Sequence, residues 1–190
     1  VKSYGAGAGG LGIGVVQSIA ETRGKAISEV TGNVFSHANL TVAAGAGLGD
    51  ESGALKMTAD SQTYGGAIIA SIPVNTSEIT NSNQVESKIE LSGDSSLENF
   101  TSVTEGSAVY LSKTTAGTGG TIASGNNSAE VNHKVSVKNE VSSSSSVGVK
   151  NAVVTASNKE KAMVLADSAG GGIILAEGTD LDANAAQVKH

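Results

Sequence analysis

The sequence predicts an all-β protein, built as a parallel β-solenoid, and three observations support this fold class. Short runs of apolar residues alternate with polar ones at a period of two, which is typical of strands. Glycine pairs recur at nearly even intervals. The 190 residues include no Trp, two Phe and three Tyr. Because large aromatic side chains dominate most globular cores, a chain that lacks them needs many thin layers of small aliphatic residues, as stacked coils provide.

An internal repeat is the strongest of these signals. Residues 54–61 (ALKMTADS) precede Gly65 and Gly66 and an Ile-Ile pair, and residues 162–168 (AMVLADS) precede Gly171 and Gly172 and a second Ile-Ile pair. Weaker copies surround the glycine pairs that end at Gly10 and Gly120. The last glycines of the four pairs lie at positions 10, 66, 120 and 172, so the intervals are 56, 54 and 52 residues.

The repeat predicts one solenoid segment over residues 1–190, with units of approximately 1–53, 54–107, 108–161 and 162–190. Since solenoid repeats commonly run about 20–45 residues, each unit is expected to form two or three coils. Eight to ten coils, each rising ~4.8 Å, would make a rod ~40–50 Å long. Because the pattern continues to both termini, the chain is expected to be a fragment of a longer rod whose ends expose strand edges.

Turn-forming residues divide the predicted strands. Ser92-Gly93-Asp94, Thr31-Gly32-Asn33 and residues 124–127 are expected at corners, where Gly and Asn adopt positive φ. Between corners, alternating aliphatic residues such as those from Ile68 to Val74 are expected to form ladders inside the coil. Pro73 interrupts that run and cannot donate to a ladder, so a bulge, strand end or exposed edge is expected there.

Composition excludes several function classes. The net charge is −6 and no stretch clusters Lys or Arg, so nucleic acid is not an expected partner. The absence of Cys excludes disulfides and thiolate metal sites. No apolar run approaches about 18 residues, so no membrane span is expected in this segment.

Motifs for catalysis or cofactor binding are weak. Residues 5–10 match the glycine pattern of dinucleotide sites, but no strand precedes them and no capped helix follows. Asp60-Ser61 and Asp167-Ser168 recur with the repeat, as expected for residues that satisfy backbone groups at turns. His37, His133 and His190 lack ligand spacing, and Asp180 with Asp182 is expected to be a solvated acidic strand rather than a calcium site. We therefore predict no catalytic residue, no cofactor site, no metal site and no enzyme activity.

Two aromatic residues are the candidate binding residues. The second unit carries additional residues around 92–104, which are expected to form a loop off the rod. Loops on rigid scaffolds commonly carry binding residues, and aromatic rings anchor sugar and protein contacts. Phe100 and Tyr110, close to this expected loop, are the predicted contact residues.

The repeat resembles a known class of bacterial proteins. The cycle of an apolar strand, Ala-Asp-Ser, Gly-Gly and Ile-Ile, followed by polar and Val-rich strands, is similar to the passenger repeats of leukotoxin-type and haemagglutinin-type filamentous adhesins. These proteins leave Gram-negative bacteria by a two-partner, type V route. The resemblance implies a right-handed parallel β-helix, an extracellular or cell-surface location, an outer-membrane transporter for the parent chain, and a role in adhesion or host-cell damage.

The expected function is therefore structural and adhesive: a rigid stalk with a possible contact surface for a host-cell glycan or protein receptor. The segment is expected to be monomeric, with end-to-end association through its strand edges as a further possibility. Two alternatives remain open at this point. One is a carbohydrate-cleaving β-helix, as in lyases or phage tailspikes, and the other is a self-assembling extracellular matrix or filament protein.

Overall fold

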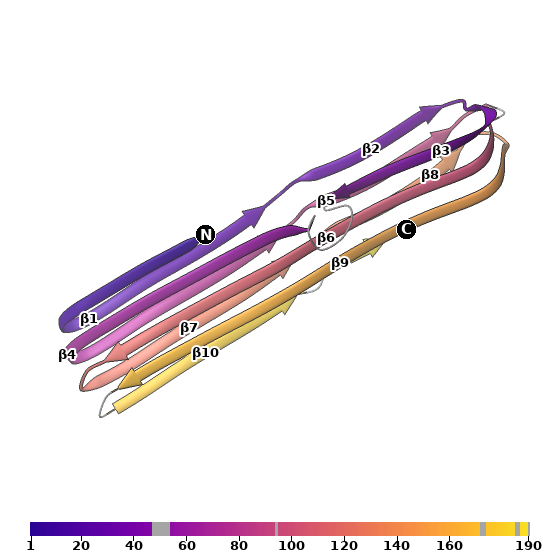
Figure 1. Ribbon diagram of the computed structural model, residues 1–190. Coiled ribbons are helices and arrows are strands. Elements are labelled where there is room, and N and C mark those ends of the chain that lie inside the picture. Colours follow the sequence, from indigo (N-terminus) through magenta and orange to yellow (C-terminus); the bar gives the residue numbers. More distant parts are fainter. Residues whose placement is uncertain (47–53, 94, 172–173, 185–186, 190) are drawn as a thin grey trace.

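A computed structural model describes residues 1–46, 54–93, 95–171, 174–184 and 187–189 (Figure 1). The regular structure of these residues is entirely β, with no helix among them, as the sequence predicts. The strands are β1 (Lys2–Thr22), β2 (Lys25–Gly32), β3 (Phe35–Ala46), β4 (Leu55–Asn81), β5 (Gln84–Leu91), β6 (Ser95–Gly119), β7 (Ile122–His133), β8 (Ser136–Ser143), β9 (Val147–Gly171), β10 (Ile174–Asn184) and β11 (Gln187–Lys189).

The chain runs back and forth along one long axis (Figure 1). At one end, here called the tip, it folds back within β1 and β4 and between β6 and β7 and between β9 and β10. At the opposite end, the far end, it turns between β2 and β3, between β5 and β6, and between β8 and β9. One passage to the tip and back to the far end is called a circuit. Forward strands lead to the tip, and return strands lead away from it.

Every pair of neighbouring strands is parallel among those described. Lys2 lies opposite Asp60, 58 residues later, and Ser95 lies opposite Val147, 52 residues later. The return strands β1, β4, β7 and β10 lie side by side, and β2, β5, β8 and β11 continue them to the far end. The forward parts of β1 and β4, together with β3, β6 and β9, form the second layer. The outer edges of β1 and β9 pair with no other described strand.

The predicted size of a coil is wrong. One unit of the repeat makes one circuit, not two or three coils, because the parallel partner of each strand lies a whole unit away. The molecule is also longest along its strands, not along the stack. The 25 residues of β6 span about 80 Å at the usual strand rise, whereas four stacked strands measure about 19 Å across.

The glycine pairs do meet at the tip. Gly66 lies opposite Gly119, and Gly119 lies opposite Gly171, so one glycine from each of three pairs lies in a common column. The first pair is displaced, since Gly66 lies opposite Ala8. Gly120 has a φ of 155° and a Cβ added there would lie 2.5 Å from the carbonyl oxygen of Ala67. The fold-back between β6 and β7 therefore requires glycine at this position.

The additional residues of the second unit do not form a loop at 92–104. Ser95–Thr104 belongs to β6 and pairs with both β3 and β9. The extra length lies elsewhere, because Ala46 and Leu55 are opposite Gly106 and Ala108, which are only two residues apart. Most of it therefore falls on residues 47–53, outside the described part of the chain.

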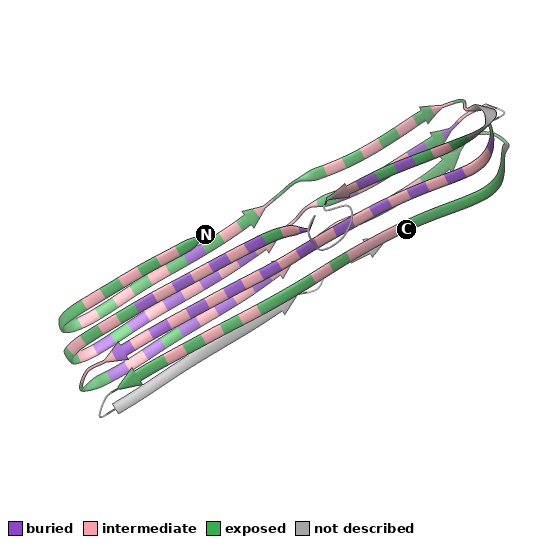
Figure 2. Ribbon diagram, in the orientation of Figure 1, coloured by how far each residue is buried: buried purple, intermediate pink, exposed green. Residues whose placement is uncertain are grey.

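Side chains alternate between the interior and the surface along β4, β5, β6 and β7, as Figure 2 shows. The apolar interior lies in the middle and the far half. One cluster contains Met57, Ile79, Tyr110 and Val131, a second contains Ile89, Leu91, Leu97 and Phe100, and a third contains Val85 and Val137. Their burial is the expected outcome for alternating strands with one apolar face.

The interior near the tip is polar instead. Ser71, Asn75 and Ser77 point inward from β4, whereas Ile72 is 40% exposed and Ile68 is 80% exposed. The expected internal ladder of aliphatic residues from 68 to 74 is therefore wrong in its direction. Pro73 is buried within β4, and no ladder pair with β7 forms at residues 72 and 73. Its missing N–H explains the gap.

Candidate functional site

The two predicted contact residues lie in the interior. Phe100 is 3% exposed and packs with Leu91 and Leu97, and Tyr110 is fully buried beside Met57 and Ile79. Both rings belong to the inward-facing set of β6, which is a continuous strand and not a loop. The structure therefore places both predicted contact residues in the interior, although Phe100 lines a pocket with Val141 and Val149.

Tyr110 is the centre of a buried polar cluster. Its hydroxyl donates to Oε1 of Glu160 at 2.7 Å and accepts a hydrogen bond from Nδ2 of Asn81 at 2.7 Å. Oε2 of Glu160 contacts Nδ1 of His133, whose ring centroid lies 5.4 Å from that of Tyr110. Burial raises the pKa of Tyr110, and the hydrogen bond to Glu160 and its negative charge raise it further.

This cluster joins three successive circuits. Asn81 belongs to β4, Tyr110 and His133 belong to β6 and β7 of the next circuit, and Glu160 belongs to β9 of the circuit after that. The side chains of Glu160 and His133 are 7% and 12% exposed. Both oxygens of the Glu160 carboxylate therefore have partners, one in the Tyr110 hydroxyl and the other in the His133 ring. The arrangement therefore fixes the forward layer to the return layer, and we assign it no reaction.

The serine of the first Asp-Ser pair is also structural. Ser61 is fully buried, and its hydroxyl donates to the carbonyl oxygen of Val16 at 3.1 Å. The pair lies within β4 and not at the turn expected from the sequence. Residues 5–10 lie within β1, so the glycine pattern of a dinucleotide site has neither the loop nor the helix that such a site needs.

The most unusual surface is an exposed aliphatic patch on the outer side of the return strands near the tip. We call this surface the aliphatic face and define it as Leu11, Ile13 and Val15 of β1, Ile72 of β4 and Ile122 of β7. The three side chains of β1 are 72%, 74% and 73% exposed, and those of Ile72 and Ile122 are 40% and 41% exposed. The pairing register places them together, since Ile13 lies opposite Ile72 and both Leu11 and Ile122 lie opposite Ala70.

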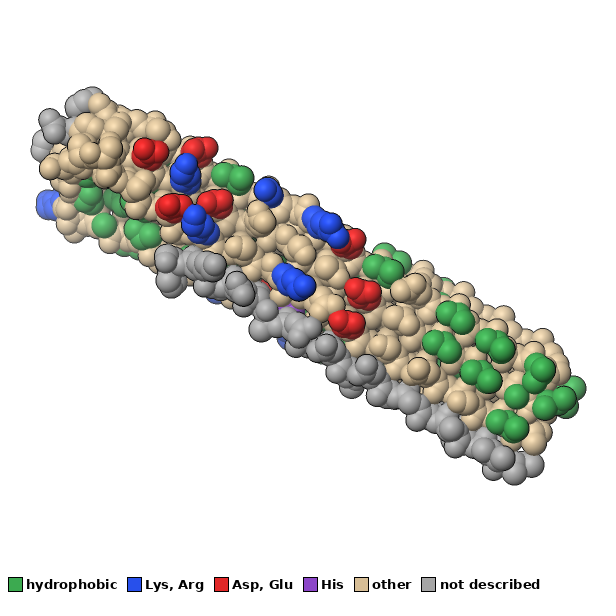
Figure 3. All heavy atoms as spheres, turned by 180° about the vertical axis from the view of Figure 1, so that it is seen from behind, with side chains coloured by type: hydrophobic (Ala, Val, Ile, Leu, Met, Phe, Trp, Pro, Cys, Tyr) green, Lys and Arg blue, Asp and Glu red, His purple; other side chains and the backbone are tan. Residues whose placement is uncertain are grey.

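The half of the molecule around the tip also carries no charged side chain in its first three circuits. Asp, Glu, Lys and Arg are absent from residues 3–20, 61–77 and 114–129. The charges that end these stretches are aligned, with Lys2 opposite Asp60 and Asp60 opposite Lys113. Figure 3 shows apolar side chains without charged ones at one end of the molecule, and charged side chains together with a second group of apolar ones over the rest. The aliphatic face therefore lies on stretches of the first three circuits that carry no charge.

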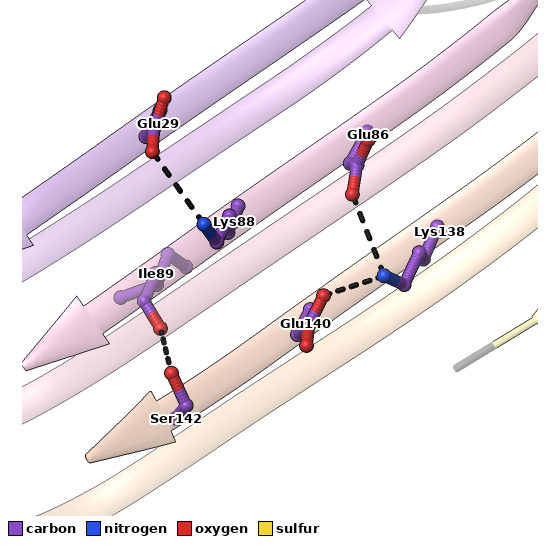
Figure 4. A network of polar contacts seen from close by, with 7 residues as sticks. All are labelled: Glu29, Glu86, Lys88, Ile89, Lys138, Glu140 and Ser142. Atoms are coloured by element: carbon purple, nitrogen blue, oxygen red, sulfur yellow. Dashed lines mark hydrogen bonds and ion pairs between the residues drawn. The ribbon is translucent and has the colours of Figure 1, made fainter. Parts of the chain in front are cut away.

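The far half carries an ordered array of charges instead (Figure 4). Lys88 of β5 lies 3.8 Å from Glu29 of β2, and Lys138 of β8 lies 3.5 Å from Glu86 and 2.5 Å from Glu140. Opposite charges thus face each other across parallel strands, which favours this register. The hydrogen bond from Lys138 and its positive charge lower the pKa of Glu140. We call these five residues the charge ladder.

Several candidates fall outside what the structure describes. His190 and the side chains of His37, Asp180 and Asp182 lie outside the described part of the chain. Among the described residues, no group of three His, Asp or Glu side chains is placed to hold a metal ion. The described residues also contain no helix long and apolar enough to cross a membrane.

Sequence reasoning missed the aliphatic face, although two signals could have found it. The first is the absence of charge from 61–77, because a partly exposed strand normally carries charged residues on its solvent side. The second is the position of Asn75 and Asn127, which are 52 residues apart and therefore equivalent in successive units. Had these residues been assigned to the interior, the isoleucines of opposite parity would have been assigned to the surface.

Comparison with known proteins adds no further constraint: no protein family, curated protein or solved structure matches this chain.

Proposed function

We propose that the chain is a segment of a large bacterial surface or secreted filamentous adhesin or leukotoxin, folded as a right-handed parallel β-helix with wide coils. The proposal rests on the repeat, which resembles the passengers of such proteins, and on parallel pairing along the whole length of each circuit. In this role the segment lies outside the cell and takes part in contact with the host.

The observation that carries the proposal is the shape of a circuit. Each circuit uses about 52 residues, since Ser95 lies opposite Val147, yet adds only about 4.8 Å to the stack. A β-helix with short coils would gain the same rise with far fewer residues. Wide circuits therefore contribute little reach and much flat surface, which favours a contact role for this segment over that of a long stalk.

We assign host contact to the outer surface of the far half, where the charge ladder lies. Its lysines and glutamates are partly exposed and are held in fixed rows by the strands. A rigid row of charges and hydroxyls suits a glycan or protein receptor, because little side-chain freedom is lost on binding.

The test is a binding screen with the 190-residue chain on glycan arrays and on host cells by flow cytometry. We expect saturable binding that the double variant Lys88→Glu and Lys138→Glu weakens at least tenfold. The double variant Lys2→Glu and Lys161→Glu makes the same change in net charge at exposed positions outside the ladder, and it should bind like the wild type.

Two results would contradict the proposal. Absence of binding to every glycan and cell type by folded protein would remove the contact role. Cleavage of a polysaccharide by the purified chain would support a carbohydrate-active β-helix in its place.

A further inference from the structure

We infer that the aliphatic face is a self-association surface, on which a second copy of this chain packs face to face. The first argument is its composition. Its five aliphatic side chains are between 40% and 74% exposed, and they lie on stretches of three circuits that contain no Asp, Glu, Lys or Arg, in a chain whose net charge is −6. Contiguous exposed apolar surface of this kind marks a site of association.

The structure beneath the face explains why its side chains point outward. Ser71, Asn75 and Ser77 occupy the interior positions of β4. Asn75 donates to the carbonyl oxygen of Thr115 at 2.7 Å, and Ser77 donates to that of Ala59 at 2.8 Å. These bonds fix the parity of the strand, so a rotation that buried Ile72 would expose bonded amides and break them. The exposed aliphatic residues are thus a stable feature of the fold.

The size of the surface suits a weak dimer. Extended along β1 to Ile19, which is 46% exposed, the apolar surface is about 26 Å long, and across β1, β4 and β7 it is about 14 Å wide, which gives a flat footprint of roughly 360 Å². The accessible area of a side-chain surface exceeds its flat footprint, and specific interfaces bury about 800 Å² per partner. A reversible dimer that forms with rising concentration is therefore expected.

Charge favours one relative orientation. Glu78 lies opposite Glu130 at the boundary of the uncharged half on the return strands. If two copies packed with parallel strands, these acidic residues would face their own copies. If the two-fold axis lies across the strands instead, the tips overlap in opposite directions and each charged half extends beyond its partner. In that arrangement β1 faces β1, and Val15, midway between Leu11 and Ile19 on β1, lies opposite Val15 of the second copy.

A lipid bilayer is the less favoured occupant. The face carries no Lys or Arg that could bind anionic headgroups. The outer edge of β1 has no described partner strand, and unpaired backbone groups are costly in hydrocarbon. A second copy imposes no such cost, because the edge of β1 stays in water when two sheets pack face to face.

Sedimentation velocity across a wide range of protein concentration tests the inference. We expect the wild-type chain to shift from monomer to dimer, and the double variant Ile13→Lys and Ile72→Lys to need at least tenfold higher concentration. Ile27→Lys is the matched control, since Ile27 is 58% exposed on β2 in the charged half and lies opposite Glu86; it should dimerise like the wild type. Circular dichroism establishes that each variant is folded.

Cysteine crosslinking tests the orientation, because the chain contains no native cysteine. Packed sheets lie about 10 Å apart, which is beyond the reach of a disulfide, so a short bis-maleimide is the reagent. Val15→Cys should give a crosslinked dimer and Ile27→Cys should not. A wild-type chain that stays monomeric at every concentration overturns the inference. So does flotation of this monomer with liposomes that the double variant abolishes, which would assign the face to a membrane.

Discussion

The carboxamide of Asn75 donates a hydrogen bond to Oδ1 of Asn127, 3.1 Å away in the next circuit, and both side chains are fully buried. Asn127 in turn donates to the carbonyl oxygen of Asp167 at 3.1 Å. The two amides therefore bond to each other across neighbouring circuits and to backbone carbonyl groups of the opposite layer. This ladder replaces an apolar core near the tip, where aliphatic side chains face outward.

The first prediction concerns this ladder. Asn127→Ala removes the acceptor of Asn75 and leaves the carbonyl of Asp167 without its side-chain donor, so the free energy of unfolding should fall by about 2 kcal/mol. Asn126→Ala is the control, because Asn126 is exposed on the same strand and should change stability by less than about 0.5 kcal/mol. Urea unfolding measures both. Equal effects of the two substitutions would contradict a buried amide ladder.

The second prediction concerns the tip. Gly120→Ala should destabilise the chain by roughly 1–3 kcal/mol, because the φ of 155° is unfavourable for other residues and the new Cβ would approach the carbonyl of Ala67. Gly119→Ala is the control, since its Cβ would meet no atom closer than 4.0 Å. Thermal unfolding distinguishes the two variants. If Gly119→Ala is the more harmful, the fold-back described here is wrong.

The sequence predicted the all-β class, because period two is a local property of the chain, and the spacing of its glycine pairs matches the length of one circuit. The corners at Gly32 and Gly93 were also predicted correctly, and both glycines have positive φ. The expected turn at residues 124–127 was wrong, since these residues lie within β7. Gly125 and Asn127 are buried within this strand, and no corner forms there.

Coil width and side-chain direction could not be predicted, and both for physical reasons. Width depends on which strands pair across a whole unit, and no local pattern records that choice. Direction near the tip depends on whether buried amides find partners. Rules based on burying aliphatic residues place Ile72 inside, but the bonds of Asn75 and Ser77 outweigh this preference. Phe100 and Tyr110 were assigned to the surface for a different reason, the loop expected around 92–104, whereas their parity on β6 makes them core residues.

The third prediction concerns the charge ladder. Lys138→Ala should raise the pKa of Glu140, because that pKa is lowered by the hydrogen bond and charge of Lys138. A carboxyl whose folded pKa lies below its unfolded value stabilises the fold above the unfolded pKa, and this stabilisation is lost as the pH falls through the folded pKa. NMR titration of the glutamate carboxyls measures the change.

The loss of stability in Lys138→Ala should be small and should disappear at high salt, because exposed ion pairs are weak and screened. Lys56 is exposed on β4 and forms no ion pair with the described residues. Lys56→Ala therefore serves as the control, with no salt-dependent effect. An unchanged pKa of Glu140 in Lys138→Ala would refute the ladder.

The last prediction concerns alkaline pH. The pKa of Tyr110 is raised above its ordinary value by burial and by Glu160, whereas in the unfolded chain it is about 10. Above that pH the unfolded state loses a proton that the folded state keeps, so the free energy of unfolding falls until the pH passes the folded pKa. Tyr110→Phe should remove this part of the pH dependence, and Tyr4→Phe, at a site 65% exposed, should leave it unchanged. Urea unfolding between pH 8 and pH 11 measures the slopes; identical slopes for wild type and Tyr110→Phe would show that Tyr110 ionises freely and is not buried against Glu160.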